Sequence, residues 1–188
     1  MVLSKLAQEV SDAMVATVKG ADDVLSALRG AVKNQVSGAL KDAGDLAVSG
    51  LDTVSDVVQG SVSAASEVGV SLTNAAQGAV STAVQGVSEV GGDVLEAVKK
   101  AAHGAVTGAS DIGGDVAQVA VSAVQGAIDA AGLVGTSTAE AAEAAAMSAV
   151  KAADEVSDKV GQEVRNALLS AAALPRDVIG KVIGGSKS

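Results

Sequence analysis

The chain has 188 residues and a formal net charge of −9, and it contains no Phe, Trp, Tyr or Cys. An acidic chain without aromatic residues has neither the basic surface nor the stacking side chains of nucleic-acid-binding proteins, so we expect no nucleic-acid partner. Its apolar residues are mostly Ala and Val, whereas aromatic side chains supply much of the burial in globular cores. We therefore expect an elongated helical architecture instead of a compact, multi-layered domain.

Two segments bear on localisation. Glu9 and Asp12 interrupt the apolar core that a signal peptide needs. The uncharged segment from Val116 to Ile128 is bracketed by Asp115 and Asp129 and is shorter than the roughly 20 apolar residues of a membrane-spanning helix. The sequence thus predicts a cytoplasmic protein without signal peptide or transmembrane helix, with attachment to a membrane or lipid surface as the alternative.

An eleven-residue repeat runs through most of the chain. When the sequence from Ser11 to Pro175 is written in lines of eleven, columns 3, 4, 7, 8 and 11 are apolar or small, and Arg29 is their only charged residue. At about 3.67 residues per turn, these columns fall on one face of an α-helix, whereas a strand would alternate residue by residue. The pattern predicts an all-α protein with one continuous apolar stripe, elongated or folded as a hairpin, with packing like that of an eleven-residue-repeat coiled coil.

A second, 22-residue period places glycine inside this stripe. Small residues let another helix approach closely, while the alternative is a hinge, since an interior Gly costs about 1 kcal/mol relative to Ala. We expect helix-packing contacts at four glycines and six apolar residues. They are Gly69, Gly91, Gly113, Gly135, Val57, Val68, Val90, Ile112, Val116 and Ile128.

Composition divides the chain into four segments. Residues 1–53 form an N-terminal amphipathic helical segment, 54–142 hold Gly/Val/Ser-rich 22-residue repeats, 143–174 form an Ala-rich helix, and 175–188 form a short C-terminal helix and tail. The low helix propensity of GLVGTST, residues 132–138, predicts an internal turn. Pro175 disfavours helix at the residue before it, and the short C-terminal helix is expected from Arg176 to Ile183.

The sequence offers little catalytic chemistry. His103 is the only histidine and lies on the polar face, whereas zinc sites need clustered ligands. The motifs GxSxG, GxxxxGK[ST] and GxGxxG do not occur, and the Lys99–Lys100 pair is too small for an anion patch. We expect a protein that is not an enzyme and needs no metal or cofactor.

Two classes of partner can cover an apolar stripe of this length. In the first, the stripes of several chains, or of two arms of one chain, face one another, and repetition builds an oligomer, fibre or tube. In the second, the helix lies in the plane of a membrane or lipid-droplet surface. Self-association is the function that we expect from the sequence, and a lipid or vesicle coat is the alternative.

The alternative, a lipid or vesicle coat, is supported by a resemblance to known families. The segments QGAVSTAVQGVSEVGG (77–92) and AAHGAVTGASDIGGDV (101–116) resemble the eleven-residue repeats of perilipins and synucleins, over about residues 55–130. Uncharacterised bacterial proteins rich in Ala, Gly and Val are similar too. The resemblance is in pattern and composition, and it implies the coating of lipid droplets or vesicles. The chain departs from those families in lacking rows of Lys at the stripe edges, and its net charge of −9 would be repelled by anionic lipid.

Overall fold

The computed structural model describes residues 21–42 and 48–185, and within these ranges the chain is helical with no strand. The helices are α2 (Ala21–Asp42), α3 (Val48–Glu67), α4 (Leu72–Glu89), α5 (Val94–Asp111), α6 (Val116–Val134), α7 (Thr138–Val156), α8 (Asp158–Ser170) and α9 (Arg176–Gly184). The all-α prediction is therefore confirmed. The signal-peptide prediction and the end of the predicted C-terminal tail fall on residues 1–20 and 186–188, outside the described residues.

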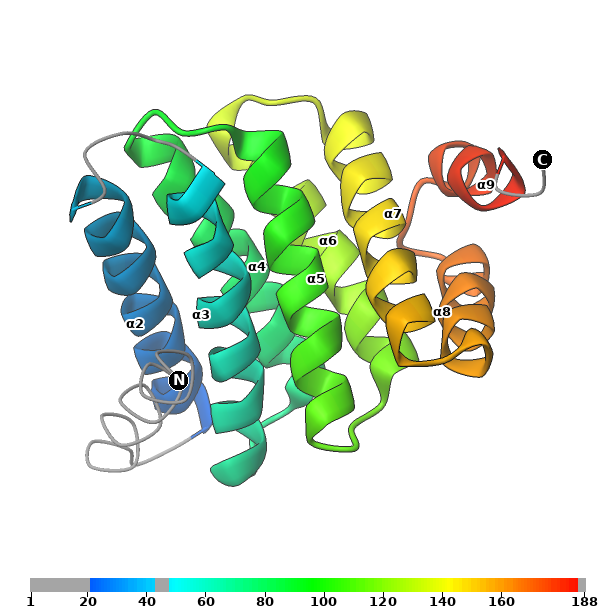
Figure 1. The fold of residues 1–188 in the computed structure, drawn as a ribbon, viewed down its shortest axis with the longest axis horizontal. Coiled ribbons are helices and arrows are strands. Elements are labelled where there is room, and N and C mark those ends of the chain that lie inside the picture. Colours follow the sequence, from blue (N-terminus) through cyan, green and yellow to red (C-terminus); the bar gives the residue numbers. More distant parts are fainter. Residues whose placement is uncertain (1–20, 43–47, 186–188) are drawn as a thin grey trace.

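The helices form two layers instead of one long rod or a hairpin (Figure 1). Helices α3, α5 and α7 lie side by side in one layer, and α2, α4 and α6 lie side by side in the other. From α2 to α7 consecutive helices are antiparallel, and helices in the same layer are parallel. Helix α8 packs on α6 and α7, and α9 packs on α7 and α8. The expectation of an elongated or hairpin molecule is therefore corrected to a layered array.

The 22-residue period corresponds to one helix and one turn. Helices α4 to α7 begin at positions 72, 94, 116 and 138, at a constant spacing of 22. A Ser or Asp precedes each helix and accepts a hydrogen bond from a backbone N–H of its first turn, as N-cap residues do. These caps are Ser71, Asp93, Asp115 and Ser137.

The four glycines of the stripe lie in the turns and do not mediate helix packing. Their φ angles are +73° at Gly69, +77° at Gly91, +65° at Gly113 and +76° at Gly135. Nothing lies within 4 Å of a Cβ atom built at any of them. Left-handed backbone without a Cβ penalty is what a helix C-terminus needs, so the packing role expected from the sequence is wrong for these glycines.

Two terminal features match the sequence predictions more closely. The turn expected in residues 132–138 is confirmed, since α6 ends at Val134 and α7 begins at Thr138. The short helix expected after Pro175 is α9, which begins at Arg176 as predicted and ends at Gly184. The division into four compositional segments stays a prediction, and one cluster of buried residues extends from Val32 to Ile179 across them.

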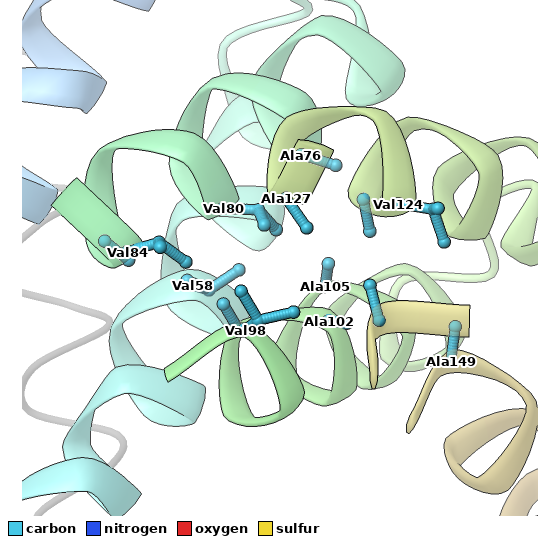
Figure 2. Packing of buried hydrophobic residues seen from close by; sticks show 14 of the residues in the cluster. Val58, Ala76, Val80, Val84, Val98, Ala102, Ala105, Val124, Ala127 and Ala149 are labelled. Carbon is cyan, nitrogen blue, oxygen red and sulfur yellow. The ribbon is translucent and has the colours of Figure 1, made fainter. Parts of the chain in front are cut away.

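The core between the layers consists of Ala and Val. Figure 2 shows Val58 of α3, Val80 of α4, Val98 of α5 and Val124 of α6 pointing into the space between the layers, and all four are fully buried. Each buried Val contributes roughly 1.5–3 kcal/mol and each Ala less. The stripe thus meets other helices of the same chain, and a layered core forms without aromatic residues because small side chains bring the helices close together.

Neighbouring parallel helices approach through glycines outside the stripe. A Cβ atom at Gly104 of α5 would overlap the carbonyl oxygen of Ser55 in α3, and one at Gly108 would lie 2.8 Å from the Gln59 oxygen. Gly126 of α6 meets the backbone of α4 in the same way. These glycines lie in polar columns of the repeat, outside the apolar stripe. They let each helix approach its parallel neighbours in the same layer.

Candidate functional site

A groove of about 610 Å³ crosses the outer face of the layer formed by α3, α5 and α7. Its wall on α3 carries two aspartates, its floor on α5 carries a glutamate, two lysines and the histidine, and its wall on α7 carries a methionine and a lysine. The residues that line it are Asp52, Ser55, Asp56, Glu96, Lys99, Lys100, His103, Ala144, Met147, Ser148 and Lys151. We call this surface the charged groove.

The charged groove collects every basic residue of the central array. Between residues 48 and 156 the sequence has only Lys99, Lys100, His103 and Lys151 as basic side chains, and all four line the groove. Lys99 and Lys100 looked like an isolated pair in the sequence. Folding brings Lys151 beside them from α7, which is two helices further along the chain, because alternate helices share a layer.

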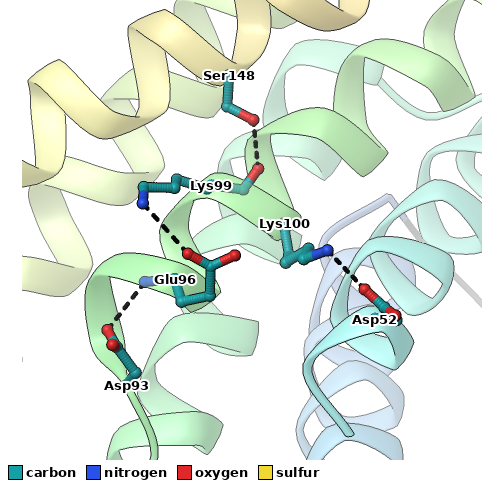
Figure 3. Close-up of polar contacts among 6 residues, drawn as sticks. All are labelled: Asp52, Asp93, Glu96, Lys99, Lys100 and Ser148. Atoms are coloured by element: carbon teal, nitrogen blue, oxygen red, sulfur yellow. Dashed lines mark hydrogen bonds and ion pairs between the residues drawn. The ribbon is translucent and has the colours of Figure 1, made fainter. Parts of the chain in front are cut away.

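Polar side-chain contacts tie the three helices together across the groove, and Figure 3 shows those made by Lys99 and Lys100. Lys100 Nζ donates to Asp52 Oδ1 at 2.5 Å, which joins α5 to α3. His103 Nε2 lies 3.0 Å from Glu155 Oε2, which joins α5 to α7. Lys99 Nζ donates to Glu96 Oε2 on its own helix at 3.2 Å. These pairs are partly exposed, so each adds at most about 1 kcal/mol to stability.

Backbone contacts fix the helices beneath these charges. Ser148 Oγ donates to the carbonyl oxygen of Lys99 at 2.6 Å, and Asp93 Oδ1 accepts a hydrogen bond from the Glu96 N–H at 3.0 Å. The first bond holds α7 against α5, and the second caps the start of α5. Figure 3 shows both bonds on either side of the Lys99–Glu96 pair. The charged groups are thus presented from rigid helices.

The electrostatic environment shifts the pKa of two groups in the groove. The hydrogen bond with Asp52 raises the pKa of Lys100, with further support from the carboxylates nearby. Burial, followed by repulsion from Asp52, raises the pKa of Asp56, and Lys100 partly opposes the rise. Asp56 therefore holds its proton more tightly than a fully solvated aspartate does.

The six apolar residues predicted as packing contacts lie at different depths. Val57 is buried in the core, and Val90, Ile112, Val116 and Ile128 are partly buried against the same core. Val68 packs against a smaller cluster beside α2.

The charged groove and the close-approach glycines escaped the sequence reasoning. A signal for the glycines was present in Gly104 and Gly108, which are four residues apart as at tight helix contacts. Their position in polar columns hid them. The groove had no comparable signal, because Asp52, Lys100 and Lys151 come together only through the layer geometry.

A different groove lies on the outer face of α2, α4 and α6. It is lined mainly by amide and hydroxyl side chains, and Gln77 Nε2 donates across it to Asp129 Oδ2 at 2.8 Å. Leu133 at its edge is 71% exposed. Only two charged residues, Arg29 and Asp129, line this groove, so the two faces of the array differ in chemistry.

Within the described residues, no three His, Cys, Asp or Glu side chains are arranged to hold a metal ion. In the same ranges one helix, α6, has the length and composition of a membrane span, and 44% of it is buried in the fold. No protein-family model matches the chain, and no curated protein matches it.

Proposed function

We propose that this protein is a non-enzymatic structural protein, a scaffold of repeated helices that associates with copies of itself. The observation that carries the proposal is a constant register between parallel helices. Gly104 contacts Ser55, Gly126 contacts Gln77, and Ser148 contacts Lys99, and each pair is 49 residues apart. Repetition of one interface is how structural repeat proteins extend a surface of regular geometry.

In this proposal, the eleven-residue repeat serves to build the scaffold. A helix and its turn together span two repeats, so every helix presents the same apolar columns to the opposite layer. The apolar stripe then serves to build the scaffold, and copies of the chain meet through its outer faces. Charges that pair across neighbouring helices, as Lys100 does with Asp52, support a rigid surface of this kind.

Sedimentation velocity with interference optics tests self-association, because the chain has no Trp or Tyr for detection near 280 nm. We expect a helical circular dichroism spectrum in buffer without lipid, and an average mass above 18.0 kDa that rises with concentration. Negative-stain microscopy distinguishes a closed oligomer from a fibre or tube. A helical monomer at all accessible concentrations contradicts the proposal.

A lipid or vesicle coat is the second candidate, and one observation favours it. Helix α6 has no charged residue from Val116 to Ile128, and Leu133 near its end is largely exposed. On a lipid surface the layers would have to separate at their glycine turns so that the stripes face the lipid. Circular dichroism with and without a neutral-lipid emulsion tests this. Binding that leaves the fold and its thermal transition unchanged would contradict a coat formed by the stripe.

A further inference from the structure

We propose that the charged groove is the surface through which two copies of this chain pair. The inference rests on the proposed function, since it names the partner and the contact. The first observation that supports it is the charge balance of the groove. The groove is lined by three acids, Asp52, Asp56 and Glu96, and by three lysines, Lys99, Lys100 and Lys151, so with a neutral histidine its charges cancel. The whole chain carries −9.

Two copies of an acidic protein repel each other over most of their surfaces. The repulsion is weakest where the local charge is balanced, and the charged groove is such a place. Its wall on α7 also exposes Met147, which at 56% is among the most exposed large apolar side chains of the described ranges. A contact there would remove apolar surface from water without bringing together two net negative patches.

The charges are also arranged as a symmetric pair needs. In a two-fold dimer the same patch serves both copies, so it must carry complementary groups on its two sides. The acids Asp52 and Asp56 lie on α3 at one edge of the groove, and Lys151 lies on α7 at the other. Helix α5 runs between these edges (Figure 1).

Of the acids and lysines that line the groove, Asp56 and Lys151 are the two that form no ion pair within one copy. In the described ranges neither takes part in any of the ion pairs. A two-fold axis that runs along α5 in the plane of the contact places the α3 edge of one copy on the α7 edge of the other, so that Lys151 of one copy lies near Asp56 of the other, twice.

The two groups lie at nearly the same level along the helices. Facing residues in neighbouring parallel helices are 49 apart, as for Ser55 and Gly104 or Lys99 and Ser148. Two such steps from Asp56 lead to residue 154 on α7, which is three residues beyond Lys151 and one before Glu155, whose carboxylate contacts His103 Nε2 of its own copy. The three-residue offset to Lys151 is less than one helical turn, which a lysine side chain can span.

The face is also large enough for a stable pair. Helix α5 has 18 residues and is therefore about 27 Å long, and three helices side by side are of similar width at about 9 Å each. The product is on the order of the 800 Å² that each partner buries in a typical specific complex. The contact consequently needs no further surface from α8 or α9.

A charge-swap experiment on the full chain tests this pairing. Lys151→Glu places two acids at each contact of its homodimer, and Asp56→Lys places two lysines there, so each variant alone is expected to dimerise at least about tenfold more weakly than the wild type. In a mixture of the two variants, the reversed charges face each other at one contact and the native pair remains at the other. The mixture should recover the wild-type dissociation constant. Lys181→Glu, which makes the same charge change on α9, is the matched control and should dimerise like the wild type.

The outcomes separate this inference from the proposed function. A wild type that is monomeric at every concentration contradicts both. Dimers that persist in both variants contradict the charged groove as the interface but leave self-association standing. Two weakened variants that do not recover on mixing contradict the Lys151–Asp56 contact. Circular dichroism of each variant shows whether a lost dimer reflects a lost fold, and recovery on mixing is possible only for folded chains.

Discussion

Gly104 in α5 lies against the carbonyl oxygen of Ser55 in α3 so closely that a Cβ atom would overlap it. Two helices further along the chain, Ser148 occupies the equivalent place and donates a hydrogen bond to the carbonyl oxygen of Lys99 at 2.6 Å. At Gly104 this position has no room for a side chain. In the next pair of parallel helices it holds Ser148, whose hydroxyl is hydrogen-bonded. The spacing of parallel helices is set by whichever small residue stands there.

Gly104→Ala should destabilise the protein because its methyl group meets rigid backbone and not a flexible side chain. Overpacking of this kind typically costs about 1–3 kcal/mol, and we expect about 2 kcal/mol in a denaturant titration followed by circular dichroism. Gly30→Ala in α2 is the matched control, since nothing lies within 4 Å of its Cβ position. That control should stabilise by roughly 0.5–1 kcal/mol. Equal effects of the two substitutions would rule out the close contact.

The glycines at the turns should respond to substitution for a different reason. Gly113 has open space around its Cβ position but a φ of +65°, which costs an L-residue about 1–2 kcal/mol. We expect Gly113→Ala to destabilise by about that amount and Gly113→Asn by less, because Asn tolerates the left-handed region best among residues with side chains. Thermal unfolding of both variants measures which of the two loses more stability. Identical losses would indicate crowding in place of backbone strain.

These two kinds of glycine explain which parts of the fold were predictable. The period, the helical conformation and the inward face of the stripe follow from residue types alone. Gly113 was misinterpreted because a glycine in every second repeat fits both a packing contact and a helix end. Asp115, two residues later, resolves the ambiguity, since a Gly followed by an N-cap residue is a stop and start signal. The sequence pattern GxD or GxS, recurring with the 22-residue period, predicts the turns when it is recognised.

The contacts within each layer were not predictable from one sequence. Gly104 and Ser55 lie far apart along the chain, and the offset between facing residues depends on the lengths of the turns and the angle between layers. The same holds for the charged groove, where Lys151 joins Lys99 and Lys100 only after two reversals of the chain. The compact core escaped prediction because large side chains are the usual source of burial, whereas here close helix approach replaces them.

The core between the layers should be sensitive to the loss of methyl groups. Val124 of α6 is fully buried, and Val124→Ala removes two carbons and leaves a small cavity, so we expect a loss of roughly 2 kcal/mol. Ser122→Ala on the same helix is the matched control, because Ser122 is only partly buried and its hydroxyl makes no described core contact. Chemical denaturation gives both values. A Val124→Ala variant as stable as the control would indicate that the layers are not packed.

Asp56 should make stability depend on pH. Burial and the charge of Asp52 raise its pKa in the folded state above 3.8, the ordinary value for an aspartate. The folded protein therefore holds this proton at pH values at which the unfolded chain has lost it, so stability falls as the pH rises from about the unfolded pKa through the folded one. At neutral pH the carboxylate is a cost to the monomer. Asp56→Asn removes the cost, and we expect the variant to be more stable than the wild type at pH 7, with a difference that shrinks steadily as the pH is lowered.

The measurement is a series of denaturant titrations between pH 3 and pH 7 at low protein concentration, so that monomers are compared. A gain that is constant with pH would show that the substitution acts through packing and not through the proton. At high protein concentration, pairing through the charged groove predicts that Asp56→Asn is less stable than the wild type. In a dimer Lys151 of the partner copy lies against Asp56, and Asp56→Asn then removes a favourable contact. A crossover of the two stabilities with concentration is therefore expected only if the raised pKa and the pairing of Asp56 with Lys151 are both correct.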